Sequence, residues 1–303
     1  MALLSGKDLP PIDNMRGAMW MVVGSVCFSM VTVIIKTLGT ELHPFVMVFF
    51  RSVFGVSIVL PFLIRDGLKI FETKRPGLHF IRLACSTVSI LAGFYAFANM
   101  PLAAAVSLSF TRPLFMIFLA VLLLGEVVRW RRGAATLVGF GGVVIMLGPT
   151  GMIFEPAAFS ALLSAAAISG ALAVIRQQAA EDGPITLMSW YAFGLVLTTL
   201  LPAIPVWQTP QGTQWFYLMA LGLLSSAGQY SFIRAFAVGE ATVMNPIDYL
   251  QILLAALFGF LFFSEIPSIW TGVGAIVIVA STLYILFREA RVKEDPPPPM
   301  SVE

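Results

Sequence analysis

One arginine of this sequence stands near the middle of a long apolar segment. Residues 102–124 read LAAAVSLSFTRPLFMIFLAVLLL, and Arg112 is far from both ends of the segment. A cation at the centre of a bilayer costs about 2.5–3.5 kcal/mol on insertion scales, so such residues face a cavity or a partner. A guanidinium binds a carboxylate through two parallel hydrogen bonds. Arg112, with Ser109 one helical turn before it, is therefore a candidate for binding an acidic group.

A second polar group occurs in another apolar segment. Asn245, Asp248 and Gln251 follow one another at a spacing of three, and Tyr249 flanks the helix face that they would share. Asp248 could meet a cationic centre of a ligand while Arg112 meets its carboxylate, which would make a site for a zwitterion. Alternatively, Arg112 and Asp248 form a structural ion pair. Buried pairs of this kind are weak stability devices, and a carrier could also break the pair when its substrate arrives.

Other polar and aromatic residues in apolar segments could line a ligand pocket. The candidates are Arg51, Tyr95, Trp190, Tyr191 and Gln229. For Arg51 an ion pair with Glu41 is an alternative, and the aromatic side chains could serve packing or interfacial anchoring. Arg82 lies close to the end of its segment, and we expect its side chain to extend toward the membrane surface. A stripe of hydroxyl residues ending at Lys36 could lead to the outer mouth of a pathway.

The composition identifies the elements that position these residues as membrane-spanning helices. Of the 303 residues, 58% are hydrophobic and 11% are charged, and the mean hydropathy is +0.91. A span needs roughly 20 apolar residues. Division at Gly, Pro and charge clusters predicts an all-α integral membrane protein with ten spans, near residues 16–36, 44–63, 77–98, 102–124, 131–148, 157–175, 185–206, 214–236, 240–263 and 268–287.

The basic residues predict the orientation of these spans. Four of the 18 Lys and Arg residues lie within spans or at the far face, namely Lys36, Arg51, Arg82 and Arg112; all the others fall on the side of the N-terminus. The positive-inside rule then places both termini in the cytosol. We expect residues 1–15 to form a cytosolic tail. Residues 288–303, which combine charges with a proline run, are expected to be a disordered cytosolic tail.

The two halves of the chain follow one plan. LLLGEVVRWRRG at 122–133 corresponds to FLFFSEIPSIWTG at 260–272, with Glu126 and Glu265 separated by 139 residues. The same offset pairs Arg112 with Gln251 and Ser109 with Asp248. Five spans in each half is an odd number, so the repeats 16–148 and 157–287 must be inverted relative to each other, a recurring plan of secondary transporters. We expect the two glutamates to be structural, because a carboxylate before a turn can reach a helix N-terminus.

The stretch PLFMIFLAVLLLGEVVRWRRGAATLVGFGGVVIML and its echo ending at Ser264 and Glu265 resemble the EamA-type branch of the drug/metabolite transporter superfamily. The stretches LHPFVMVFFRS, RPGLHFIR and DYLQILLAALFGFLFFSEIPS look most like S-adenosylmethionine uptake carriers of that branch. The resemblance implies a ten-span inner-membrane carrier, and the branch also includes amino-acid exporters and riboflavin carriers. Two features depart from it: Ser264 replaces the glycine of the signature, and Arg112 is not a constant of the branch.

The sequence thus predicts a secondary transporter without enzyme activity. We expect it to move a small polar, zwitterionic metabolite, such as an amino acid or an S-adenosylmethionine-like compound, by alternating access at a midplane cavity. The alternatives are a carrier of riboflavin or of an exported amino-acid derivative, and more remotely a membrane enzyme. The expected partners are the substrate, the lipid bilayer and a coupled proton or counter-substrate, in a monomer or homodimer. No cofactor, metal or nucleic acid is expected, and no ATP-binding P-loop is present in the sequence.

Overall fold

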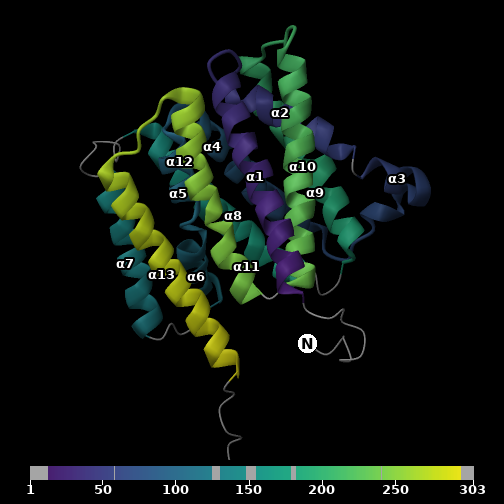
Figure 1. Cartoon of the computed structure of the whole chain (residues 1–303). Coiled ribbons are helices and arrows are strands. Elements are labelled where there is room, and N and C mark those ends of the chain that lie inside the picture. Colours follow the sequence, from purple (N-terminus) through teal and green to yellow (C-terminus); the bar gives the residue numbers. More distant parts are fainter. Residues whose placement is uncertain are drawn as a thin grey trace, which may run out of the picture.

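The computed structural model describes residues 13–57, 59–124, 130–147, 155–178, 182–239 and 241–294. Within these ranges the chain forms helices and their connections, without a strand, which confirms the all-α prediction. The helices lie side by side in one bundle, and α1 begins at the same end of the bundle at which α13 finishes (Figure 1).

The first half of the chain contains seven α-helices and one 3₁₀ helix within the described residues. They are α1 (Asn14–Leu38), α2 (Pro44–Val56), α3 (Leu60–Asp66), η1 (Gly67–Phe71), α4 (Pro76–Asn99), α5 (Leu102–Ser109), α6 (Arg112–Leu124) and α7 (Trp130–Leu147). Two of these helices, α2 and α4, begin with proline, whose fixed φ and missing N–H suit the first helical turn.

The second half repeats this order. Its elements are α8 (Pro156–Gln178), α9 (Pro184–Ala203), η3 (Ile204–Val206), α10 (Gln214–Val238), α11 (Ala241–Asp248), α12 (Leu250–Phe263) and α13 (Ile269–Glu294). The last helix corrects one expectation: residues 288–294 belong to α13 and are helical. The expected tails at residues 1–12 and 295–303 lie outside the described residues.

Six helical segments of the described residues are long and apolar enough to cross a membrane, and the bent pair α2–α3 would make a seventh. Two of the six, Leu102–Leu119 and Pro246–Phe263, run across α5–α6 and α11–α12. Two shorter apolar helices cover residues 133–147 and 269–285. Each of the ten segments predicted from the sequence coincides with a helix or with a pair of consecutive helices, whereas the number of membrane crossings stays a prediction.

The most extensive helix contacts join the two halves. They are made by α4 with α8, by α1 with α10 and by α7 with α13. Because α1 corresponds to α8 and α4 to α10 in the repeat, the first two contacts are equivalent to each other. The third joins the two last helices of the repeats. The contacts of the bundle therefore follow the two-fold plan read from the sequence.

Glycine permits the contact between α7 and α13. A Cβ on Gly274 would lie 2.6 Å from the carbonyl oxygen of Gly142, and a Cβ on Gly142 would lie 3.0 Å from that of Gly274. These two glycines therefore let α7 and α13 pack closely. Gly141 and Gly272 are not needed for the contact, since nothing lies within 4 Å of a Cβ there.

Two predicted spans are interrupted at equivalent positions. The segment 102–124 divides between α5 and α6 at residues 110–111, and the segment 240–263 divides between α11 and α12 at Tyr249. The repeat offset of 139 residues pairs residue 110 with residue 249. In the first half Pro113 explains the interruption, because it lacks the N–H that would bond to the carbonyl of Ser109. The Nε of Arg112 donates to that carbonyl instead, at 3.0 Å.

The turn after α12 contains a strained serine. Ser264 has φ 54° and ψ 29°, in the left-handed region, and it is the residue that replaces the signature glycine. A left-handed conformation costs a non-glycine residue about 1–2 kcal/mol. The departure noted in the sequence therefore has a structural cost.

We expect Ser264→Gly to raise the free energy of unfolding by about 1 kcal/mol, because glycine relieves the left-handed strain while losing some unfolded-state entropy. Thermal unfolding of the purified protein in detergent would measure the shift. Ser57→Gly is the matched control, because Ser57 has φ −53°. A midpoint that does not rise for Ser264→Gly, or that rises equally for Ser57→Gly, would contradict the strain argument.

Candidate functional site

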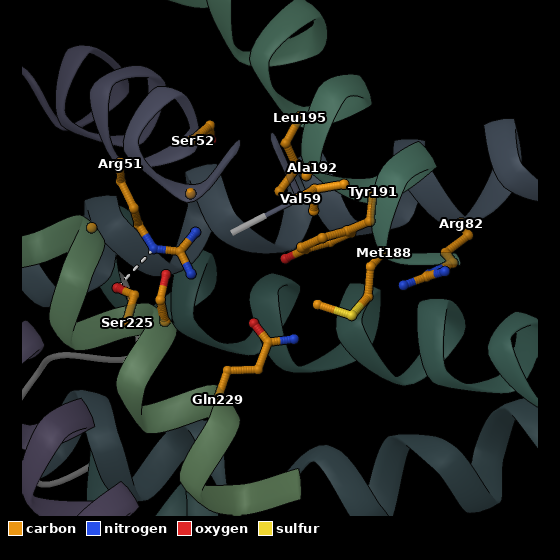
Figure 2. Close-up of a pocket in the computed structure, with 13 residues that line it drawn as sticks. Arg51, Ser52, Val59, Arg82, Met188, Tyr191, Ala192, Leu195, Ser225 and Gln229 are labelled. Carbon is orange, nitrogen blue, oxygen red and sulfur yellow. Dashed lines mark hydrogen bonds between the residues drawn. The ribbon is translucent and has the colours of Figure 1, made fainter. Parts of the chain in front are cut away.

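A cavity lies between helices of the two halves (Figure 2). Its wall is formed mainly by α2 of the first half and by α9 and α10 of the second, and α4 contributes Arg82. It contains about 610 Å³ of empty space, part of it at the open mouth. Three residues predicted from the sequence line it, namely Arg51, Tyr191 and Gln229. The cavity thus has the position, between the repeats, that the inverted-repeat plan predicts for a substrate site.

Neighbouring helices hold the side chain of Arg51 in place. Its Nε donates to Ser225 Oγ on α10 at 3.0 Å, and its guanidinium lies 5.8 Å from the ring centroid of Phe94 on α4. Its terminal nitrogens point into the cavity (Figure 2). The expected alternative, an ion pair with Glu41, is not formed: Glu41 accepts a hydrogen bond from Gln214 Nε2 at 2.8 Å.

Close helix contacts border the cavity on two sides. A Cβ on Gly222 of α10 would lie 2.5 Å from Cβ of Phe54 on α2. A Cβ on Gly194 of α9 would lie 2.6 Å from a methyl carbon of Leu83 on α4. A Cβ at either glycine would push against the facing side chain, so α10 lies close to α2 near Arg51 and α9 lies close to α4 near Arg82.

Arg82 forms the far side of the cavity. Its Nη1 donates to the carbonyl of Leu187 at 3.2 Å, and its guanidinium lies 5.4 Å from the ring centroid of Tyr191. The expectation that Arg82 extends to the membrane surface is therefore wrong, because α9 supplies a hydrogen-bond partner inside the protein. Tyr191 and Met188 also line the cavity. Tyr191 was predicted and Met188 was missed; the position of Met188, one helical turn before Tyr191 on α9, was the available signal.

A second polar cluster lies where the two spans are interrupted. We call Ser109, Arg112, Asp248, Tyr249 and Gln251 the broken-helix centre. The guanidinium of Arg112 lies 5.5 Å from the ring centroid of Phe110, and that ring lies 4.7 Å from the ring of Tyr249. Gln251 donates from Nε2 to the carboxylate of Asp248. The structure thus brings together five of the residues predicted for the site.

Arg112 and Asp248 influence each other electrostatically without a direct ion pair. Their charges interact across the centre. Among the described residues, however, the closest acceptor of Arg112 Nε is the carbonyl of Ser109, and the closest donor to Asp248 is Gln251. The cavity and the broken-helix centre share no residue.

The other predicted site residues lie elsewhere. Tyr95 packs against the largest apolar core, and Trp190 stacks on His79 at 4.9 Å while its Nε1 donates to the carbonyl of Phe71 at 3.0 Å. Both therefore follow the packing alternative. Asn245 lies in α11, and its side chain is outside the described part of the structure.

A buried polar cluster closes the bundle at the end where α4 begins. His79 Nε2 lies 2.9 Å from Asp182 Oδ2, which also accepts a hydrogen bond from Thr73 Oγ1 at 3.0 Å. His79 is 2% exposed. Since His79 lies one helical turn before Arg82, this cluster connects α4 to the start of α9 next to the cavity.

A charged cluster closes the opposite end, where α1 finishes. The ammonium of Lys36 forms an ion pair with Glu265 and donates to the carbonyl of Met100 at 2.9 Å. The other oxygen of Glu265 accepts the N–H of Leu102, the first residue of α5, at 2.9 Å. Glu265 thus binds a helix N-terminus, which confirms its structural role. Its counterpart Glu126 lies outside the described residues.

The hydroxyl stripe of α1 faces the protein interior. Ser25, Ser29 and Thr32 are each less than 9% exposed, and Lys36 at its end is engaged by Glu265. The stripe therefore lies inside the bundle and ends at the charged cluster rather than at an open mouth.

The bundle of apolar helices with a polar cavity between two repeats defines a multi-pass membrane transporter. The chain matches the EamA-like transporter family over residues 15–148 and 156–287, and it belongs to this family. It is thus a small-metabolite carrier of the drug/metabolite transporter superfamily and a protein of the bacterial inner membrane.

Curated relatives cover nearly the whole chain. An S-adenosylmethionine uptake transporter of Rickettsia prowazekii is 30% identical over 91% of this chain and 94% of its own length. A riboflavin transporter of Rhizobium johnstonii is 30% identical over 94% and 96%. The pseudopaline exporter CntI of Pseudomonas aeruginosa is 30% identical over 88% and 94%. A crystal structure with 18% identity superposes with a TM-score of 0.62, over 92% of this chain and 99% of that chain, which supports the fold.

Proposed function

We propose that this chain is a secondary carrier that moves a small zwitterionic metabolite across the inner membrane by alternating access. The observation that carries the proposal is the cavity between α2 and α4 of one repeat and α9 and α10 of the other. Movement of one repeat against the other would expose such a cavity to each side in turn. We further propose ten spans with both termini in the cytosol, because the basic residues gather on that side.

The broken-helix centre supports a zwitterionic cargo. Interrupted helices at membrane depth occur in transporters where backbone and side chains line a substrate or ion site. Arg112 and Asp248 supply opposite charges there and are not in direct contact with each other. We propose that a carboxylate and a cationic centre of the cargo engage these two residues.

Transport of labelled compounds into proteoliposomes tests the carrier function. S-adenosylmethionine, amino acids and riboflavin form the first panel, because the relatives differ in the cargo for which they are named. We expect saturable transport of at least one zwitterionic member. The proposal would be contradicted if no compound of the panel accumulated in vesicles that contain folded protein in both orientations.

Arg112→Gln and Asp248→Asn should each lower transport by about tenfold or more, because each removes a charged hydrogen-bond partner of the cargo. The same uptake assay measures the loss. Arg65→Gln and Asp66→Asn are the matched controls, since this pair is solvent-exposed on α3. If the single variants lose stability and the double variant regains both stability and transport, the residues form a structural pair instead.

A further inference from the structure

The cavity presents a guanidinium edge that the protein leaves free. Arg51 uses Nε for Ser225, and Phe94 supports the plane of the group. Among the described residues no acceptor bonds to its two terminal nitrogens, which point into the cavity (Figure 2). Ser225 and Phe94 hold the guanidinium in place, and its two terminal nitrogens remain free. These nitrogens form a preorganised fork whose geometry matches two oxygens in one plane.

Neutral polar groups gather around this fork. The hydroxyl end of Tyr191 points toward Arg51 across the cavity, and the amide of Gln229 rises from α10 into the same space (Figure 2). Both groups can donate hydrogen bonds to an oxygen. The thioether of Met188 lies between Tyr191 and Gln229 and offers an adaptable apolar surface.

The charge of the cavity has one sign. Arg51 and Arg82 line it, and none of the described lining residues is Asp or Glu. Arg82 has no described partner at its buried Nε, so neither arginine is neutralised by the cavity wall. A positive cavity in a low-dielectric surrounding attracts an anion and disfavours a ligand without one.

We infer that this cavity is a second carboxylate-binding site, separate from the broken-helix centre, in which Arg51 holds the two carboxylate oxygens of the cargo at a stage of transport when Arg112 does not bind them. Tyr191 and Gln229 donate to the same group, and Met188 contacts the remainder of the molecule. The planar fork favours a carboxylate, whereas an uncharged flavin would leave the charge of Arg51 uncompensated. The inference rests on the proposed carrier function, since it names the chemical class of the cargo.

Ligand pairs that differ only at the carboxylate test this inference. The purified full-length protein is titrated with S-adenosylmethionine, L-methionine and L-phenylalanine, and with decarboxylated S-adenosylmethionine, methioninamide and phenylalaninamide, in calorimetric and thermal-shift assays. We expect at least one acid to bind more than tenfold more tightly than its partner. Arg51→Gln should reduce this preference, Arg51→Lys should reduce it less, and Arg65→Gln, an exposed change of equal charge, should leave it unchanged.

Two results would overturn the inference. The first is that no acid of the panel binds more tightly than its partner, and the second is that folded Arg51→Gln retains the full preference. Uptake assays separate this failure from that of the carrier proposal. Transport of riboflavin without any carboxylate preference would keep the carrier function and reject the site. A carboxylate preference that depends on Arg51, in a protein that transports nothing, would keep the site and reject the function.

Discussion

Gly274→Ala is expected to lower the free energy of unfolding by about 2–3 kcal/mol, as overpacking does where helices are in contact. The added Cβ would lie 2.6 Å from the carbonyl oxygen of Gly142 and 2.9 Å from the backbone N of Met146. Backbone atoms give way less easily than the end of a side chain, so α7 and α13 must separate. This contact is one of the most extensive in the bundle.

Thermal unfolding in detergent measures this loss, and Gly272→Ala is the matched control on the same helix. Nothing lies within 4 Å of a Cβ at residue 272, so alanine there should be neutral or stabilise the helix by up to about 1 kcal/mol. Equal midpoints for the two variants would show that the α7–α13 contact is looser than described.

Glu265→Gln is the second change with a large expected effect. It removes the counter-charge of Lys36, whose side chain is 16% exposed, and it weakens the bond to the N-terminus of α5. Breaking a buried ion pair on one side costs about 3–5 kcal/mol, and partial exposure places the expected loss near the lower end, about 3 kcal/mol. The three segments that meet at Glu265 lose their common anchor.

The double variant Lys36→Met/Glu265→Met distinguishes the cost of an unpaired Lys36 charge from the cost of losing the helix cap. We expect it to recover most of the stability lost in Glu265→Gln, because no unpaired ammonium remains. Thermal unfolding in detergent is the measurement, and Glu72→Gln, at an exposed position, should shift the midpoint little. If the double variant is less stable than Glu265→Gln, the loss of stability comes from the helix cap and not from the unpaired charge.

The repeat was the most informative feature of the sequence. Its offset of 139 residues pairs the interruptions at residues 110 and 249, yet hydropathy predicted both segments as continuous. Apolar content reports membrane depth and not backbone hydrogen bonding, so the interruptions left no hydropathy signal. Pro113 was visible, but a proline inside an apolar segment is compatible with a kinked helix as well as with a broken one.

The candidate site was predicted only in part. Residue type identified Arg51 and Gln229, because polar groups at depth are expensive and need a reason. Residue types do not show which helix faces meet, and so Met188 was missed and Trp190 was chosen along with its neighbour Tyr191. Arg82 was misplaced for the same reason: its partner, the carbonyl of Leu187, is a backbone atom that no sequence pattern marks.

The two contacts that border the cavity are built in opposite senses. With the 140-residue offset between the prolines that begin α2 and α9, Phe54 and Gly194 occupy equivalent positions, and the 139-residue offset pairs Leu83 with Gly222. The large side chain belongs to α2 at one contact, where Phe54 meets Gly222, and to α4 at the other, where Leu83 meets Gly194. Equal movements of the two walls therefore deform different side chains. The chain thus has a two-fold topology without two-fold packing, and the two facing states of the proposed carrier are expected to differ in free energy before any cargo or ion binds.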